Sequence, residues 1–320
     1  MIAFGPIPSR RLGRSLGINH IPPKICTYSC VYCQLGRTPQ MQITREAFYH
    51  PEEILKKVAR KVTEASEKAE PIDYLTFVPD GEPTLDLNLG KEIELLKRLG
   101  RKIAVITNSS LLWSADVREA LCQADWVSVK IDAVAQDVWR RLDRPHGTLR
   151  LEKILRGIAD FSQTFNGELT TETMLIHGVN DTQGELERIA EVVAGLHPQK
   201  SYLAIPTRPP AEQWVHPVTE AALNRAYHIF CAQSLAVEYL IGYEGNAFAW
   251  TGHVEEDLLS ITAVHPMRAD AVRAFLAKAQ AGWEVIDRLL DEKKLHALEY
   301  QGHTFYMRTL KRTTERWCSE

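Results

Sequence analysis

Three cysteines lie close together near the start of the chain, in the segment Cys-Thr-Tyr-Ser-Cys-Val-Tyr-Cys that contains Cys26, Cys30 and Cys33. Three thiolates within eight residues can converge on one soft metal centre. Zinc normally needs a fourth protein ligand, for which His20 is the only close candidate. A cubane iron–sulfur cluster held by three cysteines instead leaves one iron open to a small molecule. The spacing favours the open cluster, with zinc or an accidental grouping as the alternative.

The other three of the six cysteines, Cys122, Cys231 and Cys318, are isolated. The first residues lack the continuous apolar stretch of a signal peptide, so disulfides are not expected in this chain of 320 residues. No apolar run approaches the ~20 residues that cross a bilayer. We therefore expect a soluble cytoplasmic protein that does not associate with a membrane.

The composition is that of a globular protein. Hydrophobic residues make up 45% of the chain and charged residues 25%, with 18 glycines and 16 prolines, which excludes a disordered, collagenous or coiled-coil chain. The net charge of −3 is too small to argue for or against nucleic-acid binding. Residues 1–45, however, carry six basic side chains and no acidic one. This segment is either a solvated basic surface or the wall of a pocket that attracts anions.

Apolar strands alternate with amphipathic helices along most of the chain. The predicted strands cover residues 15–19, 72–78, 102–109, 126–131, 168–176 and 202–205. The helices that follow them cover residues 51–69, 87–99, 114–122, 151–165, 184–196 and 219–232. This α/β pattern indicates a parallel sheet with both faces covered, and six strand–helix units are too few for a complete eightfold barrel.

Polar residues follow five successive strands of this predicted sheet. They are Glu82, Asn108, Ser109, Lys130, Asp132, His177, Asn180 and Arg208. In barrels the working residues lie just after the carboxyl ends of the strands. Turn chemistry explains any one of them, and is the better explanation for Asn180, but the repetition favours one shared site.

The three cysteines, with the aromatic Tyr32 directly before the third, resemble the signature of radical S-adenosylmethionine (radical SAM) enzymes. The resemblance implies a partial (β/α)6 TIM-like barrel in which Cys26, Cys30 and Cys33 ligate three irons of a [4Fe-4S] cluster. It also implies that S-adenosylmethionine binds the fourth iron and is cleaved reductively to a 5′-deoxyadenosyl radical, which takes a hydrogen atom from the substrate. An electron donor such as flavodoxin or ferredoxin is then a partner.

The same resemblance assigns a role to the loop after the second predicted strand. Gly81 and Glu82 lie in Asp-Gly-Glu-Pro, which aligns with the family's Gly-Gly-Glu motif, although Asp80 replaces the commoner glycine. Glu82 is expected to receive the methionine amino group of S-adenosylmethionine, because a carboxylate suits an ammonium group.

Four further residues are expected around the cofactor. By the resemblance, Asn108 and Ser109 hydrogen-bond the ribose or the carboxylate of S-adenosylmethionine. Lys130 neutralises that carboxylate, with a solvated or salt-bridged lysine as the alternative. Tyr32 packs on the adenine, or is simply part of the core.

A narrower resemblance concerns the segments from Phe4 to Asn19, Gly-Glu-Pro-Thr and Arg-Pro-Pro-Ala-Glu. They are similar to a bacterial and archaeal group that distantly resembles the wyosine-forming enzymes, which remodel a guanine in tRNA. We hypothesise that Arg10, Arg11 and Arg208, which flank the expected mouth of the barrel, grip an anionic substrate.

The C-terminal region, residues 251–320, differs from the barrel of residues 1–250. Helices are predicted over residues 258–264, 268–279 and 283–292, followed by strands over residues 295–300 and 303–308, which is a winged-helix-like arrangement. Ten basic and eleven acidic residues favour a substrate-gripping or protein-docking domain over a nucleic-acid-binding one. The cluster of Lys311, Arg312 and Arg316 leaves nucleic acid as the alternative.

Three functions therefore compete. The first is a radical SAM enzyme that acts on RNA, such as a tRNA base, and the second is a radical SAM enzyme that acts on a peptide or small molecule. The third is an iron–sulfur sensor without enzymatic activity that works through the winged helix. A sensor does not need a barrel with polar strand ends, so the sequence favours an enzyme.

Overall fold

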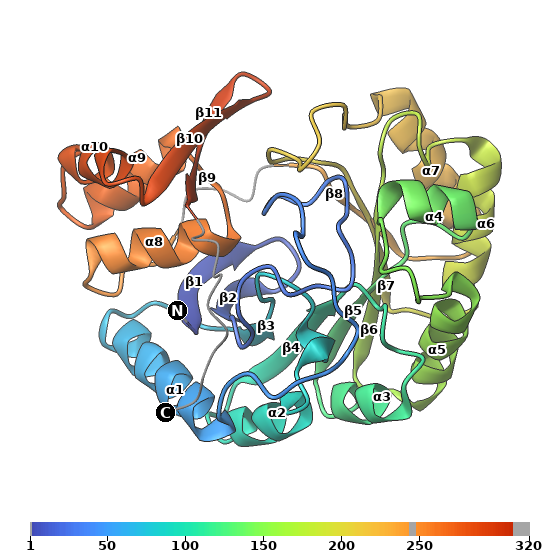
Figure 1. Cartoon of the computed structure of the whole chain (residues 1–320), viewed down its shortest axis with the longest axis horizontal. Helices are drawn as coiled ribbons and strands as arrows, with labels where there is room; N and C mark the ends of the chain where they lie inside the picture. The colour runs from blue at the N-terminus through green and yellow to red at the C-terminus, as the bar shows by residue number, and fades with distance from the viewer. Residues whose placement is uncertain (1, 243–247, 310–320) are drawn as a thin grey trace.

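The computed structural model describes residues 2–242 and 248–309. Its main element is an eight-stranded sheet whose strands, β1 to β8, are neighbours in the order of the chain. β1 runs antiparallel to β2, and every later pair of neighbours is parallel. The sheet is curled and open, so it forms a half-barrel of the TIM-like type (Figure 1).

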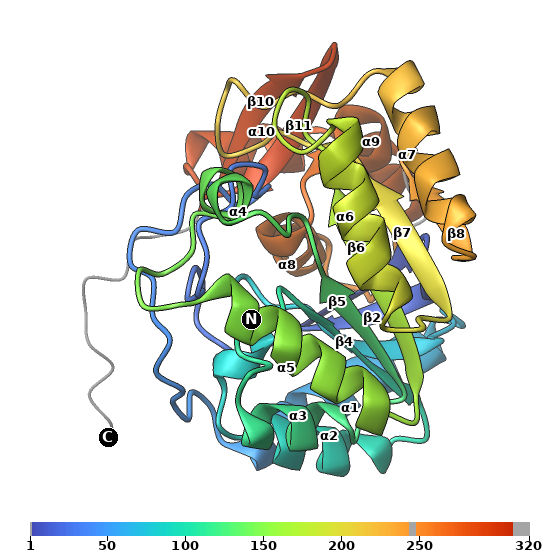
Figure 2. The ribbon, with the colours of Figure 1, turned by 90° about the vertical axis from the view of Figure 1, so that its right-hand side faces the viewer.

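Helices connect the parallel strands and cover the outside of the curl (Figure 2). The strands are β1 Ala3–Ser9, β2 Gly13–Ile18, β3 Tyr74–Phe77, β4 Lys102–Thr107, β5 Trp126–Lys130, β6 Glu168–Met174, β7 Lys200–Ala204 and β8 Val237–Leu240. The helices are α1 Pro51–Glu67, the short 3-10 helix η1 Pro83–Leu85, α2 Leu89–Lys97, α3 Ala115–Leu121, α4 Gln136–Leu142, α5 Leu151–Thr164, α6 Gln183–Ala194 and α7 Glu220–Ala232.

The strand β5 shows how the sequence divides the two faces of the sheet. Side chains alternate along a strand, so Val127 joins the core beneath the helices while Trp126 points into the curl. Trp126 is 1% exposed and fills the lower end of the interior. Ser128 and Lys130, further along the same interior face, line a cavity. Apolar filling at one end and polar residues at the other thus place a cavity at the carboxyl ends of the strands.

The structure confirms the six predicted strands to within about two residues and adds two at the edges of the sheet. β1 escaped prediction because Pro6 and Pro8 argue against a strand, but prolines are tolerated at a sheet edge. β8 was missed because it has only four residues. The six predicted strand–helix units correspond to β2 to β7, each of which is followed by a helix, and the sheet has eight strands because β1 and β8 flank them. The helix α4 was also missed.

The C-terminal region contains the predicted three helices and two strands. They are α8 Val254–Val264, α9 Ala269–Lys278, α10 Glu284–Asp291, β10 Leu295–Tyr300 and β11 His303–Arg308. A short additional strand, β9 (Met267–Arg268), completes a sheet of order β10–β11–β9. These elements share an apolar cluster of their own, built around residues such as Phe275 and Leu289. The predicted basic cluster of Lys311, Arg312 and Arg316 lies outside the described residues.

A buried ion pair fastens the C-terminal region to the half-barrel. Lys61 on α1 donates to Asp257 on α8 at 2.8 Å and to the hydroxyl of Thr251 at 2.6 Å. All three side chains are almost fully buried, so removing one partner would leave a buried charge uncompensated. In the described parts of the chain, no helix is long and apolar enough to cross a membrane.

Candidate active site

A cavity of about 320 Å³ lies at the carboxyl ends of the strands. Its walls come from the loops after β2, β3, β4 and β7, from the interior faces of β5 and β6, and from the turn between β1 and β2. The predicted site residues that line it are Arg10, Arg11, Cys26, Cys30, Tyr32, Cys33, Gly81, Glu82, Asn108, Lys130 and Arg208. Among the predicted strand-end residues, Ser109, Asp132, His177 and Asn180 do not line this cavity.

The cysteine loop is held by backbone hydrogen bonds to the segment after α4. The amide of Ser29 donates to the carbonyl of Asp143 at 3.1 Å, and that of Val31 donates to Leu142 at 2.9 Å. The hydroxyl of Tyr28, which is 5% exposed, accepts from the indole of Trp139 at 3.2 Å. These contacts within the protein therefore hold the cysteine loop in place.

The three cysteines are free and half-buried. Burial, with a smaller contribution from the charge of Glu82, raises the pKa of Cys26 to about 12, and burial also raises the pKa of Cys30. The thiolate forms therefore need a cationic centre beside them. His20, which was the expected fourth ligand of a zinc site, does not line the cavity that holds the three cysteines. The thiols therefore suit a centre that leaves one position open to a small molecule.

Gly81 allows the loop after β3 to approach the cysteine loop. A Cβ atom at this position would lie 1.8 Å from the carbonyl oxygen of Ile25, so a larger residue would push the two loops apart. The amide of the next residue, Glu82, donates to the same oxygen at 3.0 Å. This requirement for glycine explains the second position of the Asp-Gly-Glu-Pro motif.

The carboxylate of Glu82 is 1% exposed and connects β3 to β4. Its Oε1 accepts from Thr84, through the amide at 3.1 Å and the hydroxyl at 2.6 Å, and from the Thr107 hydroxyl at 2.6 Å. Its Oε2 accepts from the amide of Asn108 at 2.8 Å. Glu82 thus caps η1, as a helix-start acid does, and Oε2 keeps capacity for a second donor.

Asn108 and Ser109 point to different places although they are neighbours. The Asn108 amide group lines the cavity, where Nδ2 lies 3.6 Å from the sulfur of Cys26 and 2.9 Å from the hydroxyl of Thr27. Ser109 is 0% exposed, and its hydroxyl accepts from the amide of Lys130 at 2.8 Å. Its φ of 68° is unusual for a serine, so the turn after β4 is held in a strained conformation by this contact.

Sequence reasoning missed Glu172, which lies on β6 and lines the cavity. It pairs with Lys130 at 2.8 Å and with Arg11. Burial alone would raise the pKa of Glu172, but these two cations outweigh it and hold the pKa at about 2. Burial likewise opposes ionisation of Lys130, and Glu172 and Asp132 more than compensate, so its pKa is raised. The signal in the sequence was an acidic residue in the interior of a strand, four residues after Glu168 at its exposed start.

Tyr32 lies under this charged group. Lys130 Nζ is 4.9 Å from the centre of its ring, and its hydroxyl donates to Asp132 and, at 3.1 Å, to Asp143. Burial is the main reason why the pKa values of both aspartates are raised. Tyr32 therefore links the cysteine loop to the loops after β5 and α4.

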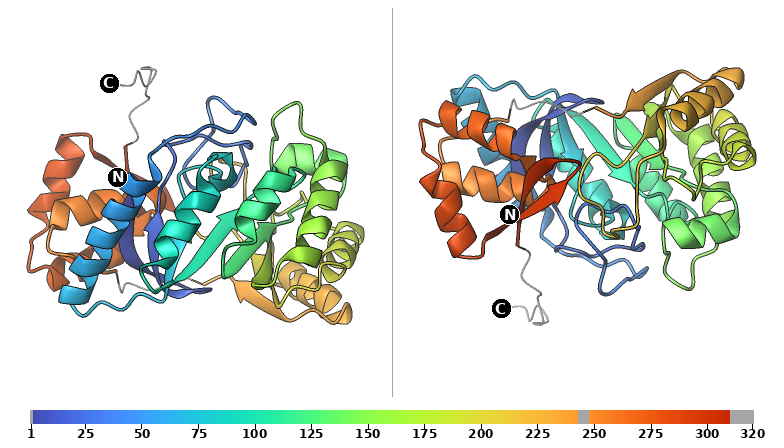
Figure 3. Two further views of the ribbon diagram at one scale, coloured as in Figure 1. Left: turned by 90° about the horizontal axis from the view of Figure 1, so that it is seen from below. Right: turned by 90° about the horizontal axis from the view of Figure 1, so that it is seen from above.

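The C-terminal region contributes to the mouth of the cavity. Arg208 donates to Gln34 at 2.8 Å and lies 2.6 Å from His265, which belongs to the C-terminal region. The hydroxyl of Tyr300 on β10 donates to the carbonyl of Pro206 at 3.1 Å, and Figure 3 shows this hairpin beside the loop after β7. The predicted mouth residue Arg208 is thus built into the contact between the two regions.

The polar residues after β6 form a turn instead of the site. Asn180 is 0% exposed, accepts from the amide of Ile176 at 2.8 Å and donates to the carbonyl of Asp132 at 2.8 Å. His177 is exposed and lies 3.3 Å from Asp181. Neither Asn180 nor His177 lines the cavity, so the turn explanation is confirmed for Asn180.

Residues 21–192, which include the cysteine loop and the strands β3 to β6, match the Radical SAM superfamily. The curled half-barrel, the cysteine loop and this match place the chain in that superfamily, and the chain therefore belongs to the radical SAM enzymes. More narrowly, a UPF0026 protein of Methanocaldococcus jannaschii is 46% identical over 97% of each chain, so the chain is also a member of the UPF0026 family. Membership of the superfamily implies radical chemistry that depends on S-adenosylmethionine.

Solved structures share the fold at low sequence identity. A radical SAM methyltransferase from Sphaerobacter thermophilus aligns with a TM-score of 0.54 and 17% identity, over 71% of this chain and 66% of that chain. SuiB of Streptococcus suis, bound to the precursor peptide SuiA, aligns with a TM-score of 0.53 and 12% identity, over 71% of this chain and 49% of that chain. Both likenesses concern the fold of the half-barrel.

Proposed function

We propose that Cys26, Cys30 and Cys33 hold a [4Fe-4S] cluster in the cavity and that S-adenosylmethionine binds beside it. The observation that carries the proposal is that three free cysteines from one short loop line one cavity. One-electron cleavage of the sulfonium, followed by removal of a hydrogen atom from the substrate, is the chemistry that this pair supplies when bound.

Two donors on the chain act on the sulfur ligands. Lys24 Nζ lies 3.7 Å from the sulfur of Cys33, and Asn108 Nδ2 lies 3.6 Å from that of Cys26. Hydrogen bonds and cations near ligand sulfurs tune the reduction potential of a cluster. Lys24 is held in place because it also donates to the carbonyl of Gly36 at 2.7 Å.

The wall formed by β3 to β6 supports the placement of S-adenosylmethionine. Glu82 Oε2 has capacity for one further donor, which suits the methionine ammonium group. Asn108 and Lys130 line the same wall, and Lys130 can attract the cofactor's carboxylate although it shares its charge with Glu172. Ser109 supports this wall from behind by fixing the start of the loop after β5.

We further propose an RNA substrate that enters the mouth beside Arg208 and is gripped inside the cavity by Arg10 and Arg11. These two arginines lie in the turn between β1 and β2, at the amino end of β2, and line the cavity from there. The position of the three arginines on the cavity wall supports an anionic substrate, while Arg11 also pairs with Glu172. A peptide or a small molecule is the competing substrate. In this proposal residues 1–250 form the catalytic domain, and residues 251–320 form a winged-helix-like domain that docks the substrate. Flavodoxin or ferredoxin supplies the electron.

Electron paramagnetic resonance of the reconstituted, reduced protein under anaerobic conditions tests the cofactor proposal. A cubane signal that changes when S-adenosylmethionine is added, with formation of 5′-deoxyadenosine, is expected. The Cys30→Ala variant should lose both results, whereas Cys122→Ala, which removes an exposed cysteine outside the cavity, should keep them. A spectrum that ignores S-adenosylmethionine, with no 5′-deoxyadenosine, would contradict the proposal and favour a sensor.

Salt dependence separates RNA from the other substrates. If about three phosphate contacts form, affinity for RNA should fall about twentyfold between 50 and 200 mM salt. Arg10→Gln should weaken binding and flatten this dependence, whereas Arg101→Gln, an exposed residue beside the amino end of β4, should not. Turnover of a substrate that is indifferent to salt would contradict an RNA substrate without affecting the cofactor proposal.

A further inference from the structure

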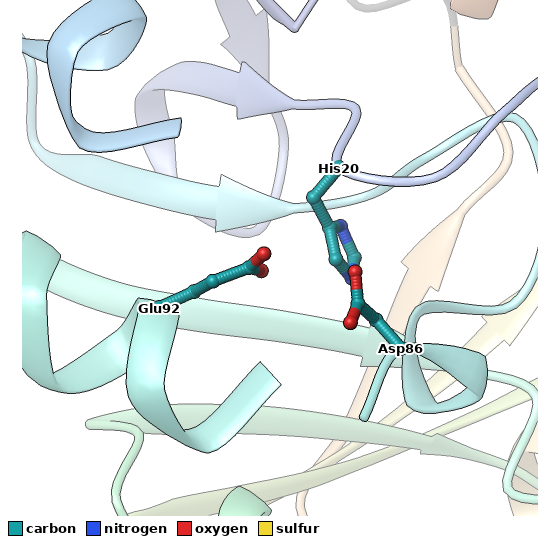
Figure 4. Close-up of side chains that lie close together, drawn as sticks. All are labelled: His20, Asp86 and Glu92. Atoms are coloured by element: carbon teal, nitrogen blue, oxygen red, sulfur yellow. The ribbon is translucent and has the colours of Figure 1, made fainter. Parts of the chain in front are cut away.

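A second group of ligand-type side chains lies behind the loop that follows β3. It consists of His20, just after β2, Asp86 at the end of η1, and Glu92 in the first turn of α2. All three are 0% exposed, and one nitrogen or oxygen atom of each lies within 4.8 Å of the others. Figure 4 shows the three side chains pointing toward one another. None of them lines the cysteine cavity.

Three of the four carboxylate oxygens in this group lack a hydrogen-bond partner in the described part of the chain. Neither oxygen of Glu92 has one among the described residues, and the same is true of Asp86 Oδ2, while Asp86 Oδ1 accepts from the amide of Asn88 at 2.7 Å. Arg45 does not supply the missing contacts, because it donates to the backbone carbonyls of Thr84 and Asp86 and to Asp116. Buried polar groups are rarely left in this state, so something has to satisfy these oxygens.

Protons and a metal cation are the two ways to satisfy them. Protonation leaves Glu92 with a hydroxyl that has no acceptor other than its neighbour. A divalent cation balances two carboxylates beside a neutral imidazole and gives each oxygen without a partner a bond.

We propose that His20, Asp86 and Glu92 bind a divalent transition-metal ion. One imidazole nitrogen with two carboxylate oxygens is a donor set that suits zinc, iron or manganese, and the imidazole disfavours calcium and magnesium. His20 Nε2 also lies 3.1 Å from the carbonyl of Pro83, which orients the ring as a second contact of a ligating histidine does.

The ion would tie three separate elements together beside the active site. His20 follows β2, Asp86 ends η1, and Glu92 begins α2, so one ion joins segments more than 60 residues apart. The 3-10 helix η1, which starts at Pro83 and precedes Asp86, follows directly on Glu82. The ion would therefore stabilise the conformation of the loop that carries Glu82. This role does not depend on the proposed function.

Metal binding is tested on the full chain with Cys26, Cys30 and Cys33 changed to serine, so that no cluster ligand competes. The protein is incubated with zinc, dialysed and analysed by mass spectrometry of the metal. We expect about one zinc per chain, bound through nitrogen and oxygen atoms only in the X-ray absorption spectrum, and a melting temperature raised by several degrees.

Glu92→Gln in the same background should retain less than about a tenth of the zinc and show no thermal shift. Glu94→Gln, on the exposed face of the same helix, is the matched control and should bind as the parent does. If Glu92→Gln fails to fold, His20→Asn is expected to show the same loss of zinc. A parent that binds no metal, or variants that bind as much as the parent, would overturn the proposal and leave protons as the neutralising charge.

Discussion

Two buried carboxylates face the same cavity, and the chain treats their charges in opposite ways. Glu82, after β3, accepts hydrogen bonds only from neutral groups in the structure, and burial raises its pKa. Glu172, on β6, pairs with Lys130 and Arg11, which overcome the effect of burial and lower its pKa to about 2. On the β6 side of the cavity, Lys130 and Arg11 thus balance the charge of Glu172. On the β3 side, the hydrogen-bond donors to Glu82 carry no charge.

The difference shows where a cationic ligand is favoured. An ammonium group near Glu172 would have to displace Lys130 or Arg11, but near Glu82 it would supply the missing charge. The asymmetry therefore supports the proposed position of the methionine amino group at the β3 side. Three substitutions and a pH series test the comparison.

The largest effect is expected for Glu172→Gln. The variant leaves Lys130 and Arg11 without their carboxylate in a half-buried position, so the free energy of unfolding should fall by about 3 kcal/mol. Urea denaturation measures this change. Glu168→Gln, at the exposed start of the same strand, should stay within about 0.5 kcal/mol of the parent. Equal losses of unfolding free energy in the Glu172→Gln and Glu168→Gln variants would show that the ion pairs of Glu172 do not stabilise the fold. The contrast with Glu82 would then disappear.

A smaller effect is expected for Glu82→Gln. Loss of the charge should weaken binding of S-adenosylmethionine about tenfold, because a hydrogen bond to an ionised group is lost. Anaerobic calorimetry on the reconstituted protein measures the affinity, and an unchanged iron content shows that the cysteine site is intact. Parent-like affinity would place the ammonium group elsewhere.

The contributions of Glu172 and Glu82 to the free energy of unfolding should also depend on pH in opposite directions. Glu172 has a depressed pKa, so its contribution is present above its ordinary value of 4.5 and is lost as the pH falls toward 2. The difference in unfolding free energy between parent and Glu172→Gln should shrink by about 1 kcal/mol from pH 5 to 3.5. Glu82 has a raised pKa, so its ionisation costs stability as the pH rises through that pKa. If the difference in unfolding free energy between parent and Glu82→Gln changed with pH as the Glu172→Gln difference does, the contrast between the two acids would be contradicted.

The smallest effect is expected for Ser109→Ala. The change removes the acceptor of the buried Lys130 amide and should cost about 1 kcal/mol of unfolding free energy. Because Ser109 does not line the cavity, affinity for S-adenosylmethionine should stay within about twofold of the parent. A tenfold loss of affinity at constant stability would show that Ser109 contacts the cofactor after all.

Much of the fold was predictable because its signals are local. Apolar runs and helical spacing located the six inner strands, and the parallel arrangement followed from their alternation with helices. β1 was not predictable, because its two prolines are acceptable only at the edge of a sheet, and edge position is a property of the whole sheet. The same holds for the four-residue β8, which gains its identity only by pairing with β7.

The sequence by itself determined the cysteine loop, since Cys26, Cys30 and Cys33 lie close enough along the chain to meet in any compact loop. It also determined that Gly81, Glu82 and Asn108 follow strands whose carboxyl ends meet at one edge. Only the tertiary structure decided which side chains turn inward, because strand register and pleat set the face of each residue. For that reason Glu172 joined the site. Ser109, in the turn beyond the end of β4, instead faces the amide of Lys130 on the neighbouring strand.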